Sequence, residues 1–193
     1  AEHNIANEVN IIETGCMGPC DYGPVMVIYP EGIFYKKVTV DDVAEIVAEH
    51  FVKGRPVSRL MLQDEEKTIA AKKDVPFYQK QVKVALENCG YINPESLDEY
   101  IATGGYEALG TVLTEMKPQD VINVIKDSGL RGRGGGGFPT HIKWQMVHDN
   151  KSDEKYIICN GDEGDPGAFM DRSLLEGDPH RVLEGMMIAA YAM

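Results

Sequence analysis

The sequence predicts an α/β fold, and three observations lead to that prediction. Short apolar runs of β-branched and aromatic residues, typical of strands, occur at residues 25–29, 33–35 and 156–159. Longer segments in which apolar residues recur at helical spacing separate and follow these runs. With 193 residues, of which 43% are hydrophobic and 26% charged, the chain can bury a core as one domain or two small ones.

The first part of the chain, residues 1–54, is predicted to alternate strands, turns and one helix. An apolar run at residues 9–12 predicts a short strand ahead of the two stronger ones, which a proline-glycine turn joins. Thr39 is a candidate N-cap for a helix that follows the strands, and Gly54 is placed to end that helix. These elements predict a small N-terminal domain.

The rest of the chain is predicted to be a connector, residues 55–80, followed by a second domain, residues 81–193. The connector is mixed in composition and rich in charged residues. Periodicity and cap residues predict helices at about 79–88, from 94, at 106–115, from 118 to a stop at Gly129, at 140–149 and at 179–191. The run at 156–159 predicts a strand between the last two helices.

Glycine concentrates in the second domain, where residues 129–167 hold nine of the 20 glycines. The run at 132–139 satisfies G-x-G-x-x-G but follows a helix and not a strand, which excludes the Rossmann dinucleotide fingerprint. Bare main chain nevertheless lets a flat or anionic ligand approach, and glycine permits successive N–H groups to point into one concavity. Arg131, Arg133 and Lys143 lie around this run. We therefore predict a ligand-binding loop, the alternative being a flexible surface loop.

An acidic loop at residues 160–167 follows the predicted strand. In open α/β sheets, ligands bind beyond the carboxyl ends of the strands, which is where this loop would lie. Its polar side chains are Asn160, Asp162, Glu163 and Asp165. Such groups suit ribose or ribityl hydroxyls, polar ring edges or a carboxamide, and they are poor phosphate ligands. The alternatives are a solvated turn or a calcium loop, and the spacing does not fit the EF-hand pattern.

The four cysteines are too few for a disulfide scaffold and are expected to be reduced thiols or metal ligands. Cys16 and Cys20 form a C-x₃-C pair, which supplies only two of the four ligands of a tetrathiolate site. The alternative is a pair of small buried thiols. Cys159 is expected to be a small core residue, because no His–Asp arrangement surrounds it. No catalytic side chain is predicted.

These motifs resemble one family closely. The segments 129–140 and 160–167, with Lys143-Trp144 and Asp171-Arg172, are similar to the FMN-containing, NADH-oxidising flavoprotein subunit of complex I. Soluble members of that family include the β subunits of NAD(P)-linked [FeFe]-hydrogenases, some of them electron-bifurcating, and of NAD-dependent formate dehydrogenases. Asp165 in place of the usual Glu, and Met146 in place of an aromatic residue, favour the soluble branch.

The resemblance implies that residues 81–193 are the first part of a Rossmann-like FMN-binding α/β domain. It implies that the glycine run lines a pocket for FMN and NAD(H) or NADP(H), that Phe138 stacks near the nicotinamide and that Asp165 contacts NADH. The residues it implies for the pocket are Gly132, Arg133, Gly134, Gly135, Phe138, Lys143, Asn160, Asp162, Glu163 and Asp165. The activity implied is electron transfer between NAD(P)H and iron–sulfur clusters through FMN.

For residues 1–54, the resemblance implies part of a thioredoxin-like ferredoxin domain that binds a [2Fe–2S] cluster through two cysteine pairs. Cys16 and Cys20 would be the second pair, and we expect the chain to begin inside that domain, which leaves the cluster site incomplete. A [4Fe–4S] cluster and further flavin contacts are expected beyond Met193. The implied partners are other subunits of an iron–sulfur oxidoreductase complex, namely a hydrogenase or dehydrogenase catalytic subunit and a small [2Fe–2S] subunit.

Composition limits the other classes of function. The formal net charge of −12, without a basic patch, argues against nucleic-acid binding. No apolar run is long enough to span a bilayer, and the first ten residues do not resemble a secretory signal, so we expect a soluble, cytoplasmic chain. A phosphate-binding P-loop protein would need a Gly-Lys-Ser/Thr ending that the glycine run lacks. A fragment of the complex I flavoprotein, or a non-catalytic docking or assembly module, remains as the alternative.

Overall fold

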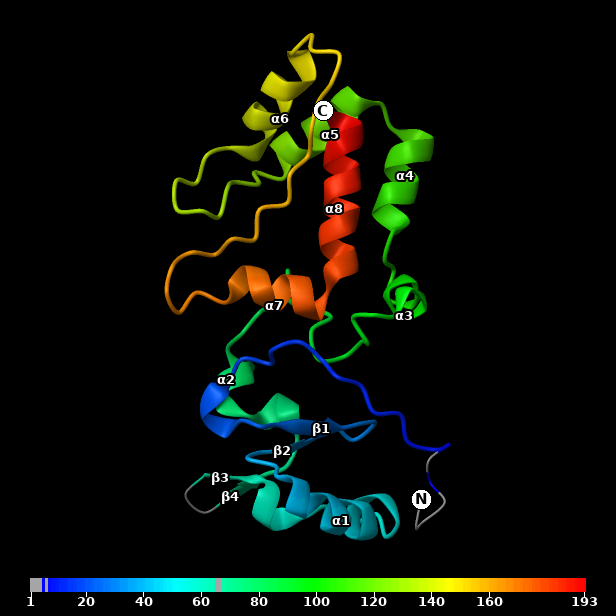
Figure 1. Cartoon of the computed structure of the whole chain (residues 1–193), viewed down its shortest axis with the longest axis vertical. Helices are drawn as coiled ribbons and strands as arrows, with labels where there is room; N and C mark the ends of the chain where they lie inside the picture. Colours follow the sequence, from blue (N-terminus) through cyan, green and yellow to red (C-terminus); the bar gives the residue numbers. More distant parts are fainter. Residues whose placement is uncertain (1–4, 6, 65–66) are drawn as a thin grey trace. The chain divides into compact units, whose positions relative to one another are not determined.

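The computed structural model describes residues 5, 7–64 and 67–193, and it divides the chain into two compact units (Figure 1). The first unit comprises Ala1–Ile11 and Met17–Val84, and the second comprises Ile12–Cys16 and Ala85–Met193. Residues 1–4 and 6 of the predicted domain 1–54, and residues 65–66 of the predicted connector, lie outside the described residues. The predicted domain boundaries at residues 54 and 80 stay predictions.

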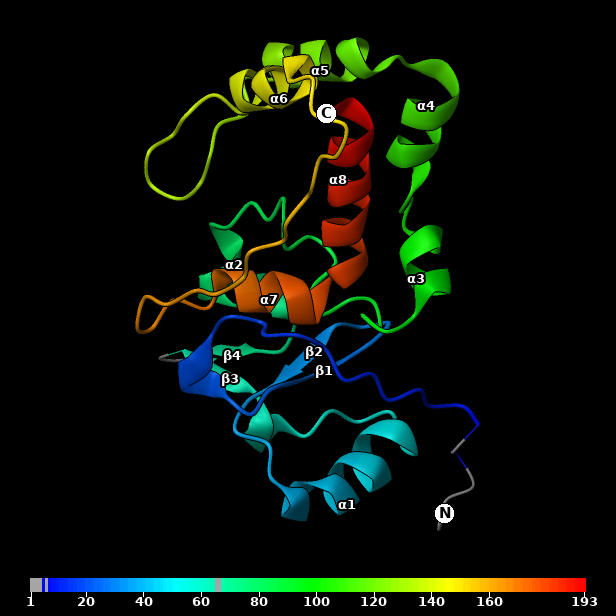
Figure 2. The same ribbon diagram turned by 45° about the horizontal axis from the view of Figure 1, so that its top comes forward.

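The described residues of the first unit form two small antiparallel sheets, each of two strands (Figure 2). In one, β1 (Met26–Ile28) pairs with β2 (Ile33–Tyr35); in the other, β3 (Leu62–Asp64) pairs with β4 (Lys67–Ile69). The strands predicted at 25–29 and 33–35 are therefore confirmed. The strand predicted at 9–12 is wrong, because this run forms no regular structure and Ile11 is 87% exposed.

The helix predicted after these strands is confirmed, and it begins where Thr39 and Asp42 form a capping box. The Thr39 N–H donates to Asp42 Oδ2 at 2.7 Å, and bonds from the Thr39 hydroxyl and N–H, with Arg59, lower the pKa of Asp42 from 3.8 to about 2. The helical turns run through η2 (Val40–Asp42), α1 (Val43–Glu45) and the π-helical η3 (Ile46–Phe51). Gly54 follows with a φ of +66°, a conformation that ends helices and favours glycine.

Tyr35 connects this helix to the sheet inside the first core. Its side chain is fully buried, its hydroxyl lies 2.8 Å from His50 Nδ1, and it accepts the Val57 N–H at 2.8 Å. The buried apolar residues around it include Ile28, Ile33, Ile46, Val57, Leu60 and Met61. The unit's remaining short helices are η1 (Cys20–Tyr22), η4 (Ser58–Leu60), η5 (Lys72–Asp74) and α2 (Pro76–Gln79).

The second unit is helical in its described residues. Its elements are α3 (Leu97–Ala102), α4 (Glu107–Glu115), α5 (Pro118–Asp127), α6 (Thr140–Asp149), α7 (Met170–Gly177) and α8 (Pro179–Ala192). The long helix α8 contacts α4, α5, α6 and α7, and the core forms where its C-terminal end meets α4 and α5. The helices predicted near 94, at 106–115, from 118, at 140–149 and at 179–191 are confirmed.

The helix predicted at 79–88 is wrong, because α2 ends at Gln79 and turns follow it. The reason is tertiary: Asn88 and Cys89 are buried against the end of α7 and the start of α8. Asn88 Nδ2 donates to Asp178 Oδ2 at 2.8 Å, and a Cβ added at Gly177 would lie 2.5 Å from the Cys89 sulfur. The main chain also passes close by, since a Cβ at Gly15 would lie 2.6 Å from the Gly177 Cα.

The strand predicted at 156–159 is also wrong. This segment is extended, but it pairs with no strand among the described residues, and Tyr156 and Ile158 are 74% and 82% exposed. A strand is defined by the neighbour that accepts its hydrogen bonds, and β-propensity alone does not supply one. The mixture of helices and small sheets is that of a partial α/β domain, which confirms the predicted fold class. Within the part of the chain that the structure describes, no helix is long and apolar enough to cross a membrane.

Candidate functional site

The glycine loop, residues 131–139, joins α5 to α6 and is closed at its base by main-chain hydrogen bonds. The Gly132 N–H donates to the Phe138 carbonyl at 2.8 Å, and the Thr140 N–H donates to the Leu130 carbonyl at 3.0 Å. These bonds bring the two ends of the loop together, so the loop has a defined base directly before the first turn of α6.

The interior of this loop is bare main chain. Gly135 and Gly137 have φ values of +99° and +57°, which glycine adopts far more readily than other residues. The N–H groups of residues 133–137 donate to no acceptor elsewhere in the described chain, and a Cβ added at Gly134 or Gly136 would meet no atom within 4 Å. The loop therefore offers several unused donors and open space beside them, which is the requirement for binding an anionic or planar group.

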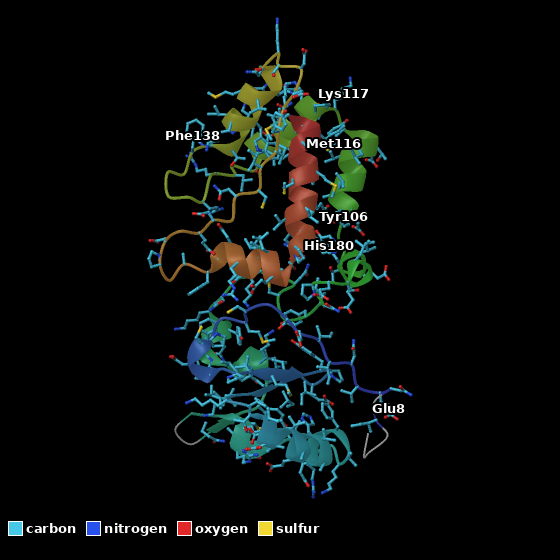
Figure 3. The ribbon with its side chains drawn as sticks, viewed as in Figure 1. Glu8, Tyr106, Met116, Lys117, Phe138 and His180 are labelled. Carbon is cyan, nitrogen blue, oxygen red and sulfur yellow. The ribbon has the colours of Figure 1, made fainter. Side chains whose placement is uncertain are left out.

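Positive charge surrounds these donors. Arg131 is used in the loop itself, since its Nη1 donates to the Gly137 carbonyl at 2.9 Å. Arg133 and Lys143 are exposed and form no ion pair with any described carboxylate. The Lys143 ammonium lies 5.6 Å from the ring centroid of Phe138, which is 43% exposed where the loop joins α6 (Figure 3). In a chain of net charge −12, two unpaired cations beside unused N–H groups favour an anionic ligand at this position.

The acidic loop is held in a different way, by side chains. Asn160 Oδ1 accepts the Asp162 N–H at 3.0 Å, and the two carboxylate oxygens of Glu163 accept the N–H groups of Asp171 and Arg172 at 2.8 and 3.1 Å. Burial acts to raise the pKa of Glu163, but these bonds, with a contribution from the Met170 N–H, outweigh burial and lower it. The Asp162 and Asp165 side chains are exposed.

Both loops extend from the same side of α8 in the two views (Figures 1 and 2). The extended segment that contains residues 156–159 leads from α6 toward the acidic loop. The groove of about 430 Å³ between α5 and α6 is a separate feature, because its lining includes neither loop. The two predicted loops therefore extend from the same side of the unit (Figures 1 and 2), and neither of them lines the groove.

A buried polar cluster where α3, α4 and α8 meet was not predicted from the sequence. Glu184 is 9% exposed and accepts the Tyr100 hydroxyl and the N–H groups of Tyr106 and Leu109, the latter two at 2.9 and 3.1 Å. Burial acts to raise the pKa of Glu184, and these three hydrogen bonds lower it overall. The Tyr106 hydroxyl lies 2.9 Å from His180 Nδ1 where α4 and α8 begin (Figure 3). Because Glu184 accepts N–H groups of the first turn of α4, the cluster stabilises the packing of α3, α4 and α8.

The predicted cysteine pair does not meet the needs of an iron–sulfur cluster by itself. Cys16 and Cys20 are both exposed, and Cys16 belongs to the second unit and Cys20 to the first. No group of three or more His, Cys, Asp or Glu side chains in the described part of the chain is placed to hold a metal ion. Two thiolates are half of a tetrathiolate set, so the described residues alone do not fit a [2Fe–2S] cluster.

Main-chain N–H groups without a partner, next to cations that form no ion pair, are typical of sites that bind an anionic group. Here they lie on the same side of the helical second unit as a carboxylate loop (Figures 1 and 2). Comparison with known proteins specifies the family. Residues 125–193 match the family described as the Nuo51 FMN-binding domain. The family resemblance found in the sequence is therefore confirmed.

Three curated relatives illustrate the range of the similarity. The NADP-reducing hydrogenase subunit HndC of Solidesulfovibrio fructosivorans is 59% identical over 115 residues, which are 60% of this chain and 23% of that protein. An NADH-quinone oxidoreductase subunit of Escherichia coli is 45% identical over 101 residues, 52% of this chain and 23% of that protein. The NAD-reducing hydrogenase HoxS subunit alpha of Cupriavidus necator is 33% identical over 186 residues, 95% of this chain and 28% of that protein. The chain thus spans about a quarter of the length of these relatives.

Proposed function

We propose that this chain forms part of the flavoprotein subunit of an NAD(P)H-linked oxidoreductase and passes electrons between NAD(P)H and iron–sulfur clusters through FMN. The observation that carries the proposal is the glycine loop at 131–139, with its unused N–H groups and the unpaired cations Arg133 and Lys143. The family match over residues 125–193 supports FMN as the ligand, and the relatives are named as an NADP-reducing hydrogenase, an NAD-reducing hydrogenase and an NADH-quinone oxidoreductase.

Different residues of the two loops would contact different parts of FMN and of the nicotinamide. The main chain of Gly134 and Gly135, with Arg133 and Lys143, would bind the anionic end of FMN. Gly132, whose N–H is used at the base of the loop, would let the flavin plane lie close to the backbone. Asn160, Asp162 and Glu163 belong to the loop that holds the ribityl and ring edges. Phe138 and Asp165 would face the nicotinamide. FMN, when bound, accepts two electrons together and releases them singly, and the protein's part is orientation and electrostatics.

The same proposal extends to the protein's surroundings. Because the relatives are named as subunits of hydrogenases and quinone oxidoreductases, we infer that this protein works in a multisubunit complex. Its partners would be a hydrogenase or dehydrogenase catalytic subunit and a small [2Fe–2S] subunit, in the cytoplasm. Cys16 and Cys20 would supply part of a [2Fe–2S] site, a [4Fe–4S] cluster would belong to a further part of the protein, and electron bifurcation is a property to measure in the assembled complex.

Flavin titration tests the proposal directly. We expect saturable quenching of FMN fluorescence by the purified 193-residue chain, and reduction of an artificial acceptor by NADH or NADPH when the complete protein is assayed. A complete protein that is colourless and inactive would defeat the proposal. Comparing NADH with NADPH in the same assay identifies the nicotinamide substrate.

A second candidate is a non-catalytic docking or assembly module. It is favoured by one observation: the groove between α5 and α6 includes neither loop. This module would retain partner subunits but would show no saturable flavin binding, so the same titration separates the two functions. A complex I flavoprotein fragment would bind FMN as well, and its partners would identify it.

A further inference from the structure

We propose that Glu163 is a positioning residue, which fixes the acidic loop on helix α7, and is not a direct flavin ligand. The proposal rests on the proposed function, since it concerns how the loop presents its other polar groups to FMN. It reassigns a residue that the sequence motif alone places among the flavin contacts.

The first argument is the use of both carboxylate oxygens. Glu163 Oε1 accepts the Asp171 N–H at 2.8 Å, and Oε2 accepts the Arg172 N–H at 3.1 Å. These are the second and third residues of α7, whose N–H groups have no partner inside the helix. Phe169, which stands at the N-cap position, makes no side-chain cap bond. Glu163 therefore performs the capping from several residues upstream, where a carboxylate also interacts favourably with the helix dipole.

The second argument is the main chain of Glu163 itself. Its φ is +48°, a left-handed conformation that is uncommon for residues other than glycine. Such a conformation persists where surrounding contacts determine it, and the two bonds to α7 are the contacts that do so here.

The third argument concerns Asp162 and Asp165, whose positions the two hydrogen bonds from Glu163 to α7 restrict. Asp162 directly precedes Glu163, and Asp165 lies between Glu163 and the helix, inside a loop that the two bonds close. The Asp165 carbonyl accepts the Ala168 N–H at 3.1 Å, and Asn160 holds the Asp162 N–H. The carboxylates on either side of Glu163 are exposed, whereas that of Glu163 faces α7. We infer that Glu163 sets the direction in which Asp162 and Asp165 point.

The experiment begins with the FMN-free chain, so its first readout does not depend on cofactor. Backbone amide hydrogen exchange at Asp171 and Arg172 is measured in the wild type, E163A, E163Q and the control E176Q. Glu176 lies on the same helix, is exposed and pairs with Arg172 side chain to side chain, so E176Q removes the same charge without touching the cap. We expect exchange to accelerate about tenfold or more in E163A and by less in E163Q, because the amide keeps one accepting oxygen. The control should match the wild type, and unchanged exchange in E163A would overturn the proposal.

The second readout is a double-mutant cycle on FMN affinity, measured with E163A, D162N and the double variant. A positioning residue acts through Asp162, so we expect E163A to weaken FMN binding about tenfold in the wild type and less than twofold in the D162N background. Independent, multiplying losses would indicate direct contact and would overturn the proposal. If the wild type binds no FMN, the proposed function is wrong. If amide exchange still accelerates in E163A in that case, the positioning role of Glu163 is retained, so the two failures are distinguishable.

Discussion

The two loops of the candidate site are closed by different kinds of contact. The glycine loop is closed by main-chain bonds between its ends. Arg133 in the loop and Lys143 on α6 form no ion pair with a described carboxylate. The acidic loop is closed mainly by one side chain, Glu163, which reaches back to α7. A loop closed by its main chain depends on backbone conformation, whereas a loop closed by one carboxylate depends on that residue and on its protonation.

This difference predicts opposite responses to substitution. The glycine loop should lose ligand binding, and not stability, when a side chain fills its open interior. The acidic loop should lose its shape when one titratable group changes. Both consequences can be measured on the same chain, and we expect the effect on the glycine loop to be the larger.

Filling the interior of the glycine loop should give the largest effect. Gly134 is surrounded by open space, so G134V should leave the unfolding temperature unchanged. If the flavin lies on this main chain, the same substitution should raise the dissociation constant of FMN by tenfold to hundredfold, which is about 1–3 kcal/mol. The measurement is flavin fluorescence titration with parallel thermal unfolding. G110A, on the exposed face of α4, is the matched control and should leave FMN affinity as it is. Equal affinity of G134V and the wild type would remove the loop from the site.

Removing the free cations should have a smaller effect. R133Q and K143Q should each weaken FMN binding about tenfold, about 1.4 kcal/mol, because charge-assisted bonds to an anionic group are lost. The salt dependence of binding should decrease in both variants, since fewer charges are screened. K151Q, two residues after the end of α6, changes the charge equally outside the loop and should behave as the wild type. A uniform response of all three variants would point to net charge and not to the loop.

Acidification should affect the acidic loop but not the glycine loop, and this is the smallest of the three expected effects. The pKa of Glu163 is lowered from its ordinary value of 4.5, so its bonds to α7 contribute fully above that pH and are lost as the pH falls below it, through the folded pKa. The main-chain bonds that close the glycine loop contain no titratable group. Amide exchange, corrected for its intrinsic pH dependence, should therefore rise at Asp171 in acid and stay constant at Gly132 and Thr140. Parallel changes at all three amides would show that the loops open together.

The sequence predicts an element of the fold correctly where the residues that determine the element lie within its own segment. The helices at 106–115 and 140–149 were predictable because periodicity and terminal residues define them within the segment itself. The strand predicted at 156–159 is absent, because a strand needs a neighbouring strand that this segment does not have among the described residues. The segment is extended, and Tyr156 and Ile158 are exposed. The helix at 79–88 was overridden by the burial of Asn88 and Cys89.

The site followed the same rule. Glycine and acidic composition indicated both loops and their residues, because open main chain and clustered carboxylates are visible in the sequence. Helix α7 was missed, since its cap comes from Glu163 several residues upstream and not from an N-cap residue next to the helix. The hydrogen-bond partners of Glu184 could not be predicted from the sequence either, because they are far from it along the chain, in α3 and at the start of α4.

The close approach of Gly15, Cys89 and Gly177 has a practical consequence for anyone handling this protein. Cys89 is 1% exposed while the other three cysteines are exposed, so an alkylating reagent should modify three thiols quickly and the fourth only when the second unit opens. The rate at which Cys89 is modified therefore measures how often the second unit opens. It reports the opening rate of the unit by intact mass alone, without a fluorophore or a bound cofactor.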